Sequence, residues 1–523
     1  MKACHKLSLL FLMLMLSCCT RPTVKTLTIC CTTDVHAQYE EGMGRVATCL
    51  KTIRAERENV IYIDNGDFLQ GDIAAVYYNS HPGNRPHYGV VALKALGADA
   101  VVVGNHDIES GPDIYSAVRD DLQPVPFLAA NTPRDDNGES YFQRYAIIEK
   151  GGVKVAVIGF TNPKCPSWLP KDLFPDFSFE KIEDIAQSIV DEVISLHSPD
   201  IVVVSAHSGL GRRSEKGSGD ETDENVAIYL SENLRNVDLV ICGHDHQEEL
   251  TENANGEGLC LVDAGTRGHC VGRIDFELDY KGSNLKSKKI ISCALDRVEN
   301  LEHDSTFLSL TEDCRKAVQE YQDEPVCSIT ETINTSEALS GPSYSTNLMH
   351  DVQFALTGAD ISITAPLGEK VIPAGKICRR DLVNLYKYEN DLYVVSMTGS
   401  QIKDYLEYSY DGWLNRNTPT FNYDSAKGIR YRVYRNRPKG SRIDILSMEN
   451  GSPFDINATY KVAMNSYRAS GGGDILVKGA GIDPMAEGFI LEKKGSVRLA
   501  LIDYLKRQGN YHPRKESNWY FTD

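Results

Sequence analysis

The N-terminal half of the sequence repeats one pattern, in which a short apolar, β-branched run stops abruptly at polar residues. Examples are "VVVGNHD" at residues 101–107 and "VDLVICGHDH" at residues 237–246. Continuous apolar runs of this length predict strands that are buried on both faces of a sheet. Stretches with helical spacing of apolar residues, such as residues 179–197, lie between the runs. The alternation predicts a layered α/β domain over residues 24–300.

Five of these runs end on residue types that bind metal ions. In α/β sheets, ligands gather at the carboxyl ends of the strands, so we expect these side chains to converge. Imidazole nitrogens, carboxylates and one amide oxygen suit zinc, manganese, iron or cobalt. A turn or a capping role would explain any one of these residues, but it explains the ordered set poorly. The candidate ligands are Asp34, His36, Asp67, Asn105, His207, His244 and His246.

The order of these residues carries a specific resemblance to a known family. The segments "DVH" (34–36), "NGD" (65–67), "GNHD" (104–107), "SAHSG" (205–209) and "GHDH" (243–246) resemble the five motifs of the calcineurin-like metallophosphoesterases. The resemblance spans most of residues 27–275. It implies a four-layered β-sandwich flanked by helices, with two divalent metal ions whose identity among zinc, manganese, iron and cobalt stays open.

The resemblance also implies how the two ions share their ligands. One ion would be held by Asp34, His36, Asp67 and His246. The other would be held by Asp67, Asn105, His207 and His244. Asp67 would bridge them, because only a carboxylate can offer one oxygen to each ion. Two such ions make water nucleophilic at neutral pH and stabilise charge on a phosphoryl group.

His106 follows a candidate ligand but is not itself assigned to a metal. The resemblance gives it the catalytic role of stabilising developing charge or protonating the leaving alcohol. A histidine in that role needs a partner that fixes its tautomer. The nucleotidase branch usually has Asp three residues later, whereas this chain has Glu109, which is one methylene longer. A first-turn carboxylate stabilised by the helix dipole is the alternative explanation of Glu109.

The chain changes character beyond about residue 300. Residues 307–322 place apolar residues from Phe307 to Tyr321 on one helical stripe, which predicts a connecting helix within residues 301–335. Residues 336–523 contain shorter strand-like runs, Gly-rich turns and more aromatic residues. We therefore expect a catalytic domain over residues 18–300 and a separate α+β domain over residues 336–523.

Two segments of this second region, residues 390–409 and 465–474, resemble the C-terminal domain of periplasmic 5′-nucleotidases and of 2′,3′-cyclic-nucleotide 2′-phosphodiesterase/3′-nucleotidases. In that superfamily the domain clamps the base between two aromatic rings, whose counterparts here would be Phe421 and Tyr467. Tyr423 competes with Phe421 for the position. Packing in the core is the usual fate of aromatic residues and is the alternative for each ring.

The same region distinguishes two branches of the superfamily. Typical 5′-nucleotidases carry an "NGGGIR"-like turn after "GAD-I-x-I", but this chain has "GADISITAPLGE" at residues 358–369, without the double glycine or the arginine. An arginine at that position would bind phosphate through charge-assisted hydrogen bonds. Four other segments, including "FNYD" at residues 421–424, look more like the cyclic-phosphodiesterase branch. A 2′,3′-cyclic-nucleotide 2′-phosphodiesterase/3′-nucleotidase is therefore favoured over a 5′-nucleotidase or a nucleotide-sugar pyrophosphatase.

The N-terminus predicts export. Lys2 and Lys6 precede an apolar run at residues 7–16 that is too short to span a bilayer. The run ends in "LMLSC", which resembles a bacterial lipoprotein box and implies a signal peptide over residues 1–17 with a lipid anchor on Cys18. Cys19 is the alternative acceptor, and an ordinary secretory signal is the alternative process. The expected location is the periplasm or the cell surface of a bacterium.

The composition narrows the range of partners. A net charge of −18 argues against binding a nucleic-acid polymer, although metals can reverse the charge locally for a small anionic nucleotide. Several of the 14 cysteines, such as Cys30, Cys31 and Cys242, lie in apolar strand-like runs and are interpreted as small buried hydrophobes rather than as a disulfide framework. The sequence indicates no protein partner. A non-catalytic nucleotide-binding lipoprotein is the alternative from another functional class.

Overall fold

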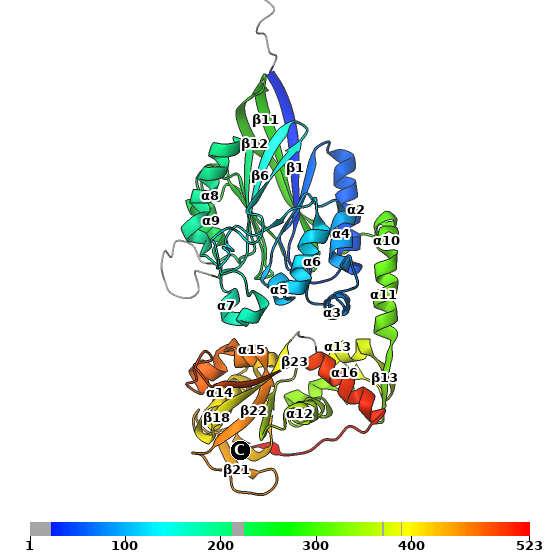
Figure 1. The fold of residues 1–523 in the computed structure, drawn as a ribbon, viewed down its shortest axis with the longest axis vertical. Coiled ribbons are helices and arrows are strands. Elements are labelled where there is room, and N and C mark those ends of the chain that lie inside the picture. Colours follow the sequence, from blue (N-terminus) through cyan, green and yellow to red (C-terminus); the bar gives the residue numbers. More distant parts are fainter. Residues whose placement is uncertain (1–21, 212–223, 369–370, 387, 389) are drawn as a thin grey trace, which may run out of the picture. The chain divides into compact units, whose positions relative to one another are not determined.

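The computed structural model describes residues 22–211, 224–368, 371–386, 388 and 390–523 (Figure 1). The predicted signal peptide and Cys18 lie outside the described residues. Within the described part of the chain, no helix combines the length and the apolar character needed to cross a membrane. The fold divides into two compact units, and the main boundary lies between Glu312 and Asp313.

The first unit is built on two six-stranded sheets. Strands β1 to β4 are parallel in the first sheet, and β11 pairs antiparallel with both β1 and β12. Its strand order is β12 (Asn284–Arg297), β11 (Cys270–Lys281), β1 (Pro22–Thr32), β2 (Val60–Asp64), β3 (Ala100–Val102) and β4 (Phe127–Leu128).

The second sheet has a parallel centre with an antiparallel strand at each edge. Its strand order is β5 (Tyr145–Lys150), β6 (Val153–Phe160), β7 (Ile201–Ala206), β8 (Leu239–Cys242), β10 (Cys260–Ala264) and β9 (Glu248–Thr251). The apolar runs that the sequence marks as buried strands form most of these two sheets.

The two sheets face one another across a shared core. Ile29, Ile63 and Val102 of the first sheet belong to the same buried cluster as Val203 and Ile241 of the second. Each such side chain contributes about 1.5–3 kcal/mol when it is fully buried. This sandwich core holds the parallel strands in place, so the loops at their carboxyl ends start from rigid supports.

Helices cover the outer faces of the sandwich. Helices α2, α4 and α6 lie beside the first sheet, and α8 and α9 lie beside the second (Figure 1). Apolar residues of α8 and α9 share a buried cluster with the outer face of β7 and β8. The four-layer architecture predicted from the sequence is thereby confirmed. The helices up to this point are α2 (Glu41–Glu56), α3 (Ile73–Ser80), α4 (Tyr88–Leu96), α5 (Asn105–Glu109), α6 (Pro112–Leu122), α7 (Cys165–Trp168), α8 (Ile182–His197) and α9 (Ala227–Asn233).

The predicted single connecting helix is wrong in one respect, because the segment forms two helices. Helix α10 (Ser305–Leu310) ends at Thr311, and α11 (Glu312–Asp323) follows. The Thr311 hydroxyl donates to the carbonyl oxygen of Phe307 (2.9 Å), a local bond that competes with continued helix. Phe307 is buried as expected, but Leu310, placed on the same stripe, is 59% exposed.

The second unit is an α+β domain, as predicted. Helix α14 packs on a five-stranded sheet in one buried cluster, while α12, α13 and α16 form a second cluster. Its helices are α12 (Tyr344–Thr357), α13 (Arg379–Leu385), α14 (Gly399–Asn415), α15 (Ser466–Ala469) and α16 (Val497–Gln508). The five-stranded sheet has the order β19 (Ser425–Lys427), β15 (Ile361–Thr364), β22 (Thr459–Asn465), β18 (Asp391–Thr398) and β23 (Ile490–Ser496).

Smaller sheets complete the second unit. One has the order β21 (Ile443–Met448), β20 (Ile429–Tyr434) and β25 (Trp519–Thr522), and another has β17 (Gly375–Cys378), β13 (Pro325–Ile329) and β24 (Asn510–Tyr511). A two-stranded ladder joins β14 (Ile333–Asn334) to β16 (Val371–Ile372).

Candidate active site

The loops after the parallel strands of the first unit bring the predicted ligands together. The structure groups Asp34, His36 and His246 in one cluster and Asp67, His207 and His244 in a second. Within each cluster, one ligand atom from each residue lies within 4.8 Å of the others. The metal-binding role of each residue, and the bridging role of Asp67, stay predictions.

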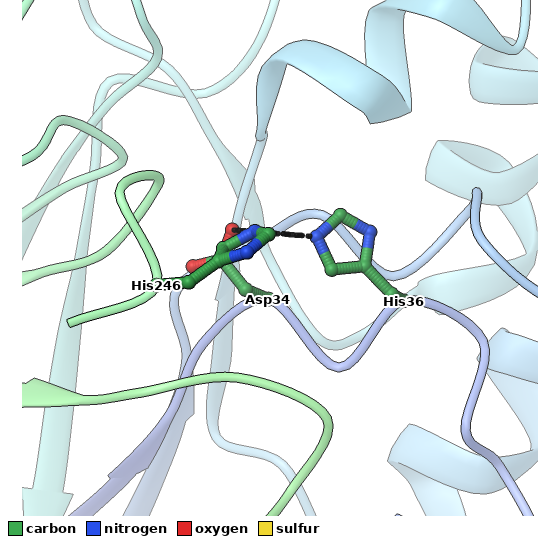
Figure 2. Close-up of side chains that lie close together, drawn as sticks. All are labelled: Asp34, His36 and His246. Carbon is green, nitrogen blue, oxygen red and sulfur yellow. Dashed lines mark hydrogen bonds and ion pairs between the residues drawn. The ribbon is translucent and has the colours of Figure 1, made fainter. Parts of the chain in front are cut away.

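The first cluster joins the β1 loop to the β8 loop. The Nε2 atoms of His36 and His246 are 2.9 Å apart, and the planes of the two rings are inclined at 74° (Figure 2). Asp34 Oδ1 lies 3.5 Å from Nε2 of His246 and 3.7 Å from Nε2 of His36. This oxygen is buried without a hydrogen-bond partner. A cation placed among the three atoms would satisfy all of them at once.

The second cluster joins the loops after β2, β3, β7 and β8. Nε2 of His207 lies 3.1 Å from Asp67 Oδ2, and Nδ1 of His244 lies 2.8 Å from Oδ1 of Asn105. Nδ1 of His207 bonds to the carbonyl oxygen of Asn65 (2.8 Å), which leaves the lone pair on Nε2 for a ligand. Nε2 also lies 3.8 Å from Asp34 Oδ1, so the two clusters are neighbours.

The electrostatic field at the clusters favours cations. Burial would raise the pKa of Asp34, but His207 and His246 lower it to about 2, so the carboxylate is ionised. Burial would lower the pKa of His207, but Asp67 and Asp34 raise it to about 10, so a metal ion that binds Nε2 would displace a proton from it. Burial lowers the pKa of His36 to about 4, so its ring is neutral at pH 7 and offers a lone pair. Buried carboxylates beside imidazoles fit divalent metal ions.

The backbone is strained at the same residues. Asp34, His36, Asp67, His244 and His246 all have positive φ, between 45° and 79°. Such conformations cost of order 1–3 kcal/mol for each residue and persist only where the surroundings impose them. Five of them among seven candidate ligands indicate that the loops are shaped to aim side chains rather than to minimise local energy.

His106 and Glu109 lie together on α5. Nδ1 of His106 is 2.5 Å from Oε2 of Glu109, so the longer side chain of glutamate makes the contact that Asp would make. The His106 ring lies 5.5 Å from that of His36 and is partly exposed. Burial would lower the pKa of His106, but Asp67 and Glu109 raise it to about 9. His106 therefore carries a proton at neutral pH, and its catalytic role stays a proposal.

The two predicted base-clamping rings are neighbours in the second unit. The centroids of Phe421 and Tyr467 are 6.4 Å apart at 77°, an edge-to-face arrangement rather than two parallel walls. Tyr467 is 39% exposed. Tyr423, the competing candidate, is buried and stacks on Trp413 (5.2 Å, 9°), so it belongs to the core of the domain.

Arg468 holds together, through hydrogen bonds, the two segments that carry these rings. It is buried, and its guanidinium donates to the carbonyl oxygens of Phe421 (2.8 Å) and Gly472 (2.6 Å). Its Nε lies 2.7 Å from Oδ2 of Asp424. Gly472 lies flat against Tyr467, because a Cβ at that position would be 2.5 Å from the ring. The arginine thus positions the rings instead of facing solvent.

Comparison with known proteins identifies the two halves of the chain. Residues 27–248 match the calcineurin-like phosphoesterase family, and residues 326–478 match the 5′-nucleotidase C-terminal domain. The chain is a calcineurin-like phosphoesterase with a 5′-nucleotidase C-terminal domain. It is therefore a hydrolase of phosphoric ester bonds, and its fold implies divalent metal ions.

Several characterised relatives of the phosphoesterase cover most of its length. It is 25% identical to the trifunctional nucleotide phosphoesterase protein YfkN of Bacillus subtilis over 94% of this chain, although the match spans only 38% of that longer protein. It is also 25% identical to the 2′,3′-cyclic-nucleotide 2′-phosphodiesterase/3′-nucleotidase of Haemophilus influenzae, over 95% of this chain and 87% of that one. The 5′-nucleotidase of Vibrio vulnificus is 23% identical, over 89% and 90%.

A solved structure shares the whole architecture of the phosphoesterase. The candidate 5′-nucleotidase from Staphylococcus aureus superimposes with a TM-score of 0.78, covering 95% of this chain and 100% of that one. Its sequence is 23% identical. The similarity supports the fold that the sequence predicts.

Asp107 of the phosphoesterase, the last residue of "GNHD", anchors two of the loops that carry candidate metal ligands. Its carboxylate accepts the backbone N–H groups of Asp67 (3.0 Å), Phe68 (3.0 Å), Leu69 (2.9 Å) and Gly104 (2.8 Å). Gly104 is required here, because a Cβ would lie 2.1 Å from Asp67 Oδ1. One buried carboxylate thus fixes the loop after β2 against the start of α5.

We expect Asp107→Ala to lower the free energy of unfolding by about 3–5 kcal/mol, because each buried N–H left without an acceptor costs about 1–3 kcal/mol. Urea denaturation followed by circular dichroism measures the change. The control is Asp136→Ala, at an exposed loop position, which should change stability by less than about 0.5 kcal/mol. Equal stability of the two variants would contradict the role of Asp107.

Three further residues contact the candidate ligands and were not assigned from the sequence. The Thr33 hydroxyl donates to Asp34 Oδ2 (2.5 Å), and Glu224 Oε1 lies 3.0 Å from Nε2 of His244. Asn65 orients His207 as described above. Thr33 precedes the motif "DVH" and Asn65 is the first residue of "NGD", so the position of both residues in the sequence is a usable signal. Glu224 lies 20 residues from His244 and outside every motif, so the sequence offers none.

Proposed function

We propose that this chain hydrolyses nucleotides outside the cytoplasm at a centre of two divalent metal ions, as a 2′,3′-cyclic-nucleotide 2′-phosphodiesterase/3′-nucleotidase. The observation that carries the proposal is the pair of adjacent ligand clusters with the His106–Glu109 pair beside the first of them. The names of the relatives support nucleotides as the substrate class.

The residues of the two clusters would hold the ions, with Asn105 completing the second. Bound there, the ions would make water nucleophilic at neutral pH and neutralise phosphoryl charge. Asp34 Oδ1 is buried without a hydrogen-bond partner, and Nε2 of His207 lies between this oxygen and Asp67 Oδ2, so a cation there would be bound by all three atoms. Nitrogen and oxygen donors in this mixture fit zinc, manganese, iron or cobalt.

His106 would act on the leaving group. Asp67 and Glu109 raise the pKa of His106 against the effect of burial, which favours a protonated ring that would donate a proton to the departing ribose oxygen as the P–O bond breaks. Glu109 would accept the remaining N–H at Nδ1, which fixes the ring and stabilises its charge. Asn105, adjacent in sequence, would contact both ion and phosphate.

The branch of the superfamily is inferred from the second domain. Residues 358–369 lack the glycines and the arginine of typical 5′-nucleotidases. Two relatives named for the cyclic-phosphodiesterase activity are 25% and 26% identical to this chain over most of its length. Hydrolysis of 5′-nucleotides is the second candidate, because relatives named 5′-nucleotidase match at 23% identity.

The test of the proposal is parallel turnover of three substrates by the metal-loaded protein. We expect release of product from 2′,3′-cyclic AMP and 3′-AMP at higher kcat/KM than from 5′-AMP. Preference for 5′-AMP would contradict the assignment to the cyclic-phosphodiesterase branch but would remain consistent with the proposed metal site. Binding of all three nucleotides without turnover would contradict the enzymatic function and would support the alternative, a non-catalytic nucleotide-binding lipoprotein.

Tyr467→Ala should raise KM for 3′-AMP about tenfold with little change in kcat, because stacking of one base on an aromatic ring is worth ~1–3 kcal/mol. Steady-state kinetics measures the split. The matched control is Tyr520→Ala, which removes a tyrosine of similar exposure from β25 of the same domain. An equal KM in wild type and Tyr467→Ala would contradict the clamp.

Export and anchoring rest on the N-terminal sequence alone. We infer that Cys18 is lipidated after removal of residues 1–17 and tethers the enzyme to a membrane in the periplasm or on the cell surface. Mass spectrometry of the mature N-terminus tests this. A diacylglyceryl group on Cys18 is the expected result, and an unmodified N-terminus beyond Cys19 would contradict it.

A further inference from the structure

Two cysteines of the first unit face each other across the sandwich core. The Sγ atoms of Cys260 and Cys293 are 3.7 Å apart. Cys260 is the first residue of β10 and pairs with Leu239 in the second sheet, whereas Cys293 lies on β12 and pairs with Ile274 in the first sheet. Both belong to the apolar cluster between the sheets. The contact between the two thiols therefore joins two separate sheets.

The two thiols differ in their access to solvent. Cys260 is fully buried, whereas Cys293 is only partly buried at the edge of the cluster. The hydrogen bond between the two sulfurs lowers the pKa of Cys293 and raises that of Cys260. An external oxidant would therefore meet Cys293 first, and Cys260 would act as the resolving thiol behind it.

We propose that Cys260 and Cys293 form a disulfide that fastens the two sheets of the sandwich together. The Cys293 thiolate attacks the disulfide of an oxidant, such as oxidised glutathione or a dithiol oxidoreductase, and expels one thiolate of that oxidant. The Cys260 thiolate then attacks Cys293 of the mixed disulfide and expels the second. The protein loses two protons and two electrons, and the oxidant gains them as two thiols.

The geometry requires only a small movement. An S–S bond is about 2.05 Å long, so the sulfurs must approach by a distance that side-chain rotation and slight strand adjustment can supply. The bond would close a loop that contains β10, β11 and most of β12. Closing a loop of this length restricts the unfolded chain more than the folded one and should raise Tm by roughly 5–10 °C.

The bond is a property of the first unit and is independent of its catalytic assignment. The sequence pattern favoured cysteines as buried hydrophobes, and Cys30, Cys31 and Cys242 are indeed fully buried in strands. Cys260 and Cys293 differ because each has a second sulfur within contact distance. Oxidising compartments are where such pairs persist as disulfides.

The test uses purified wild-type protein that is first reduced and then incubated with oxidised glutathione under native conditions. Free thiols are blocked with iodoacetamide before digestion and mass spectrometry. We expect peptides containing Cys260 and Cys293 to be linked before reduction and separate after it. Recovery of both cysteines in alkylated form from the oxidised native protein would overturn the proposal.

Thermal unfolding gives an independent readout. The wild type should melt at a higher Tm after oxidation than in the presence of dithiothreitol, and Cys293→Ser should lose this difference. Cys327→Ser, which removes a buried thiol from the second unit, should keep it. Equal Tm values of oxidised and reduced wild type would overturn the inference without requiring any variant to fold.

Discussion

Asp67→Asn should lower kcat by roughly 10³-fold or more, since the residue is the proposed bridge between two metal ions that together supply several kcal/mol of transition-state stabilisation. Asp67 Oδ2 lies 3.1 Å from Nε2 of His207, and its Oδ1 accepts the backbone N–H of His106 (2.8 Å). An amide keeps the shape but offers one oxygen and no charge. The variant should therefore fold and yet lose metal.

Two measurements on Asp67→Asn separate this explanation from a folding defect. Metal content after dialysis should fall below that of the wild type, while the circular dichroism spectrum stays native. The matched control is Asp304→Asn, because Asp304 is also a buried carboxylate but caps α10 and pairs with Lys51. Full metal content with near-normal kcat in Asp67→Asn would contradict the bridging role.

His106→Asn should lower kcat on 3′-AMP by about 10²–10⁴-fold, the usual contribution of a positioned acid, while both metal ions stay bound. The loss should be much smaller on a p-nitrophenyl phosphoester, because p-nitrophenolate leaves without needing a proton. Glu109→Gln should cost less, about 10–100-fold, since it acts through the His106 ring.

The leaving-group comparison is the decisive part of the His106 experiment. His81→Asn, at an exposed position after α3, is the control and should leave both substrates unaffected. Equal losses of His106→Asn on the nucleotide and on the p-nitrophenyl ester would show that His106 stabilises phosphoryl charge rather than protonating the alcohol. No loss on either substrate would remove it from the reaction.

Much of the catalytic unit was predictable because its signals are local in the sequence. Buried parallel strands require continuous apolar runs, so the abrupt change to Asp34, Asp67 or His207 marks the end of each strand. The carboxyl ends of the parallel strands of both sheets then lie at the same end of the sandwich, where these side chains meet. The grouping of ligands around each ion was implied by the resemblance and not by the spacing of the residues. The structure gives the distances between the candidate ligand atoms.

The features that were not predicted depend on contacts between distant segments. Whether Phe421 or Tyr423 faces outward depends on Trp413, which stacks on Tyr423. The contact between Glu224 and His244 has no local signature. The break between α10 and α11 was missed for a different reason, because a threonine that bonds its own helix backbone looks like any helical residue in a hydrophobic pattern.

The central claim is that two metal ions, held by the two clusters, are both needed for turnover. The most direct measurement titrates metal-free protein with manganese or zinc while recording bound metal and hydrolysis of 2′,3′-cyclic AMP together. The account predicts two ions bound per chain and a kcat that reaches its maximum only as the second site fills. Full turnover with one ion bound, or two bound ions without turnover of any nucleotide, would contradict it.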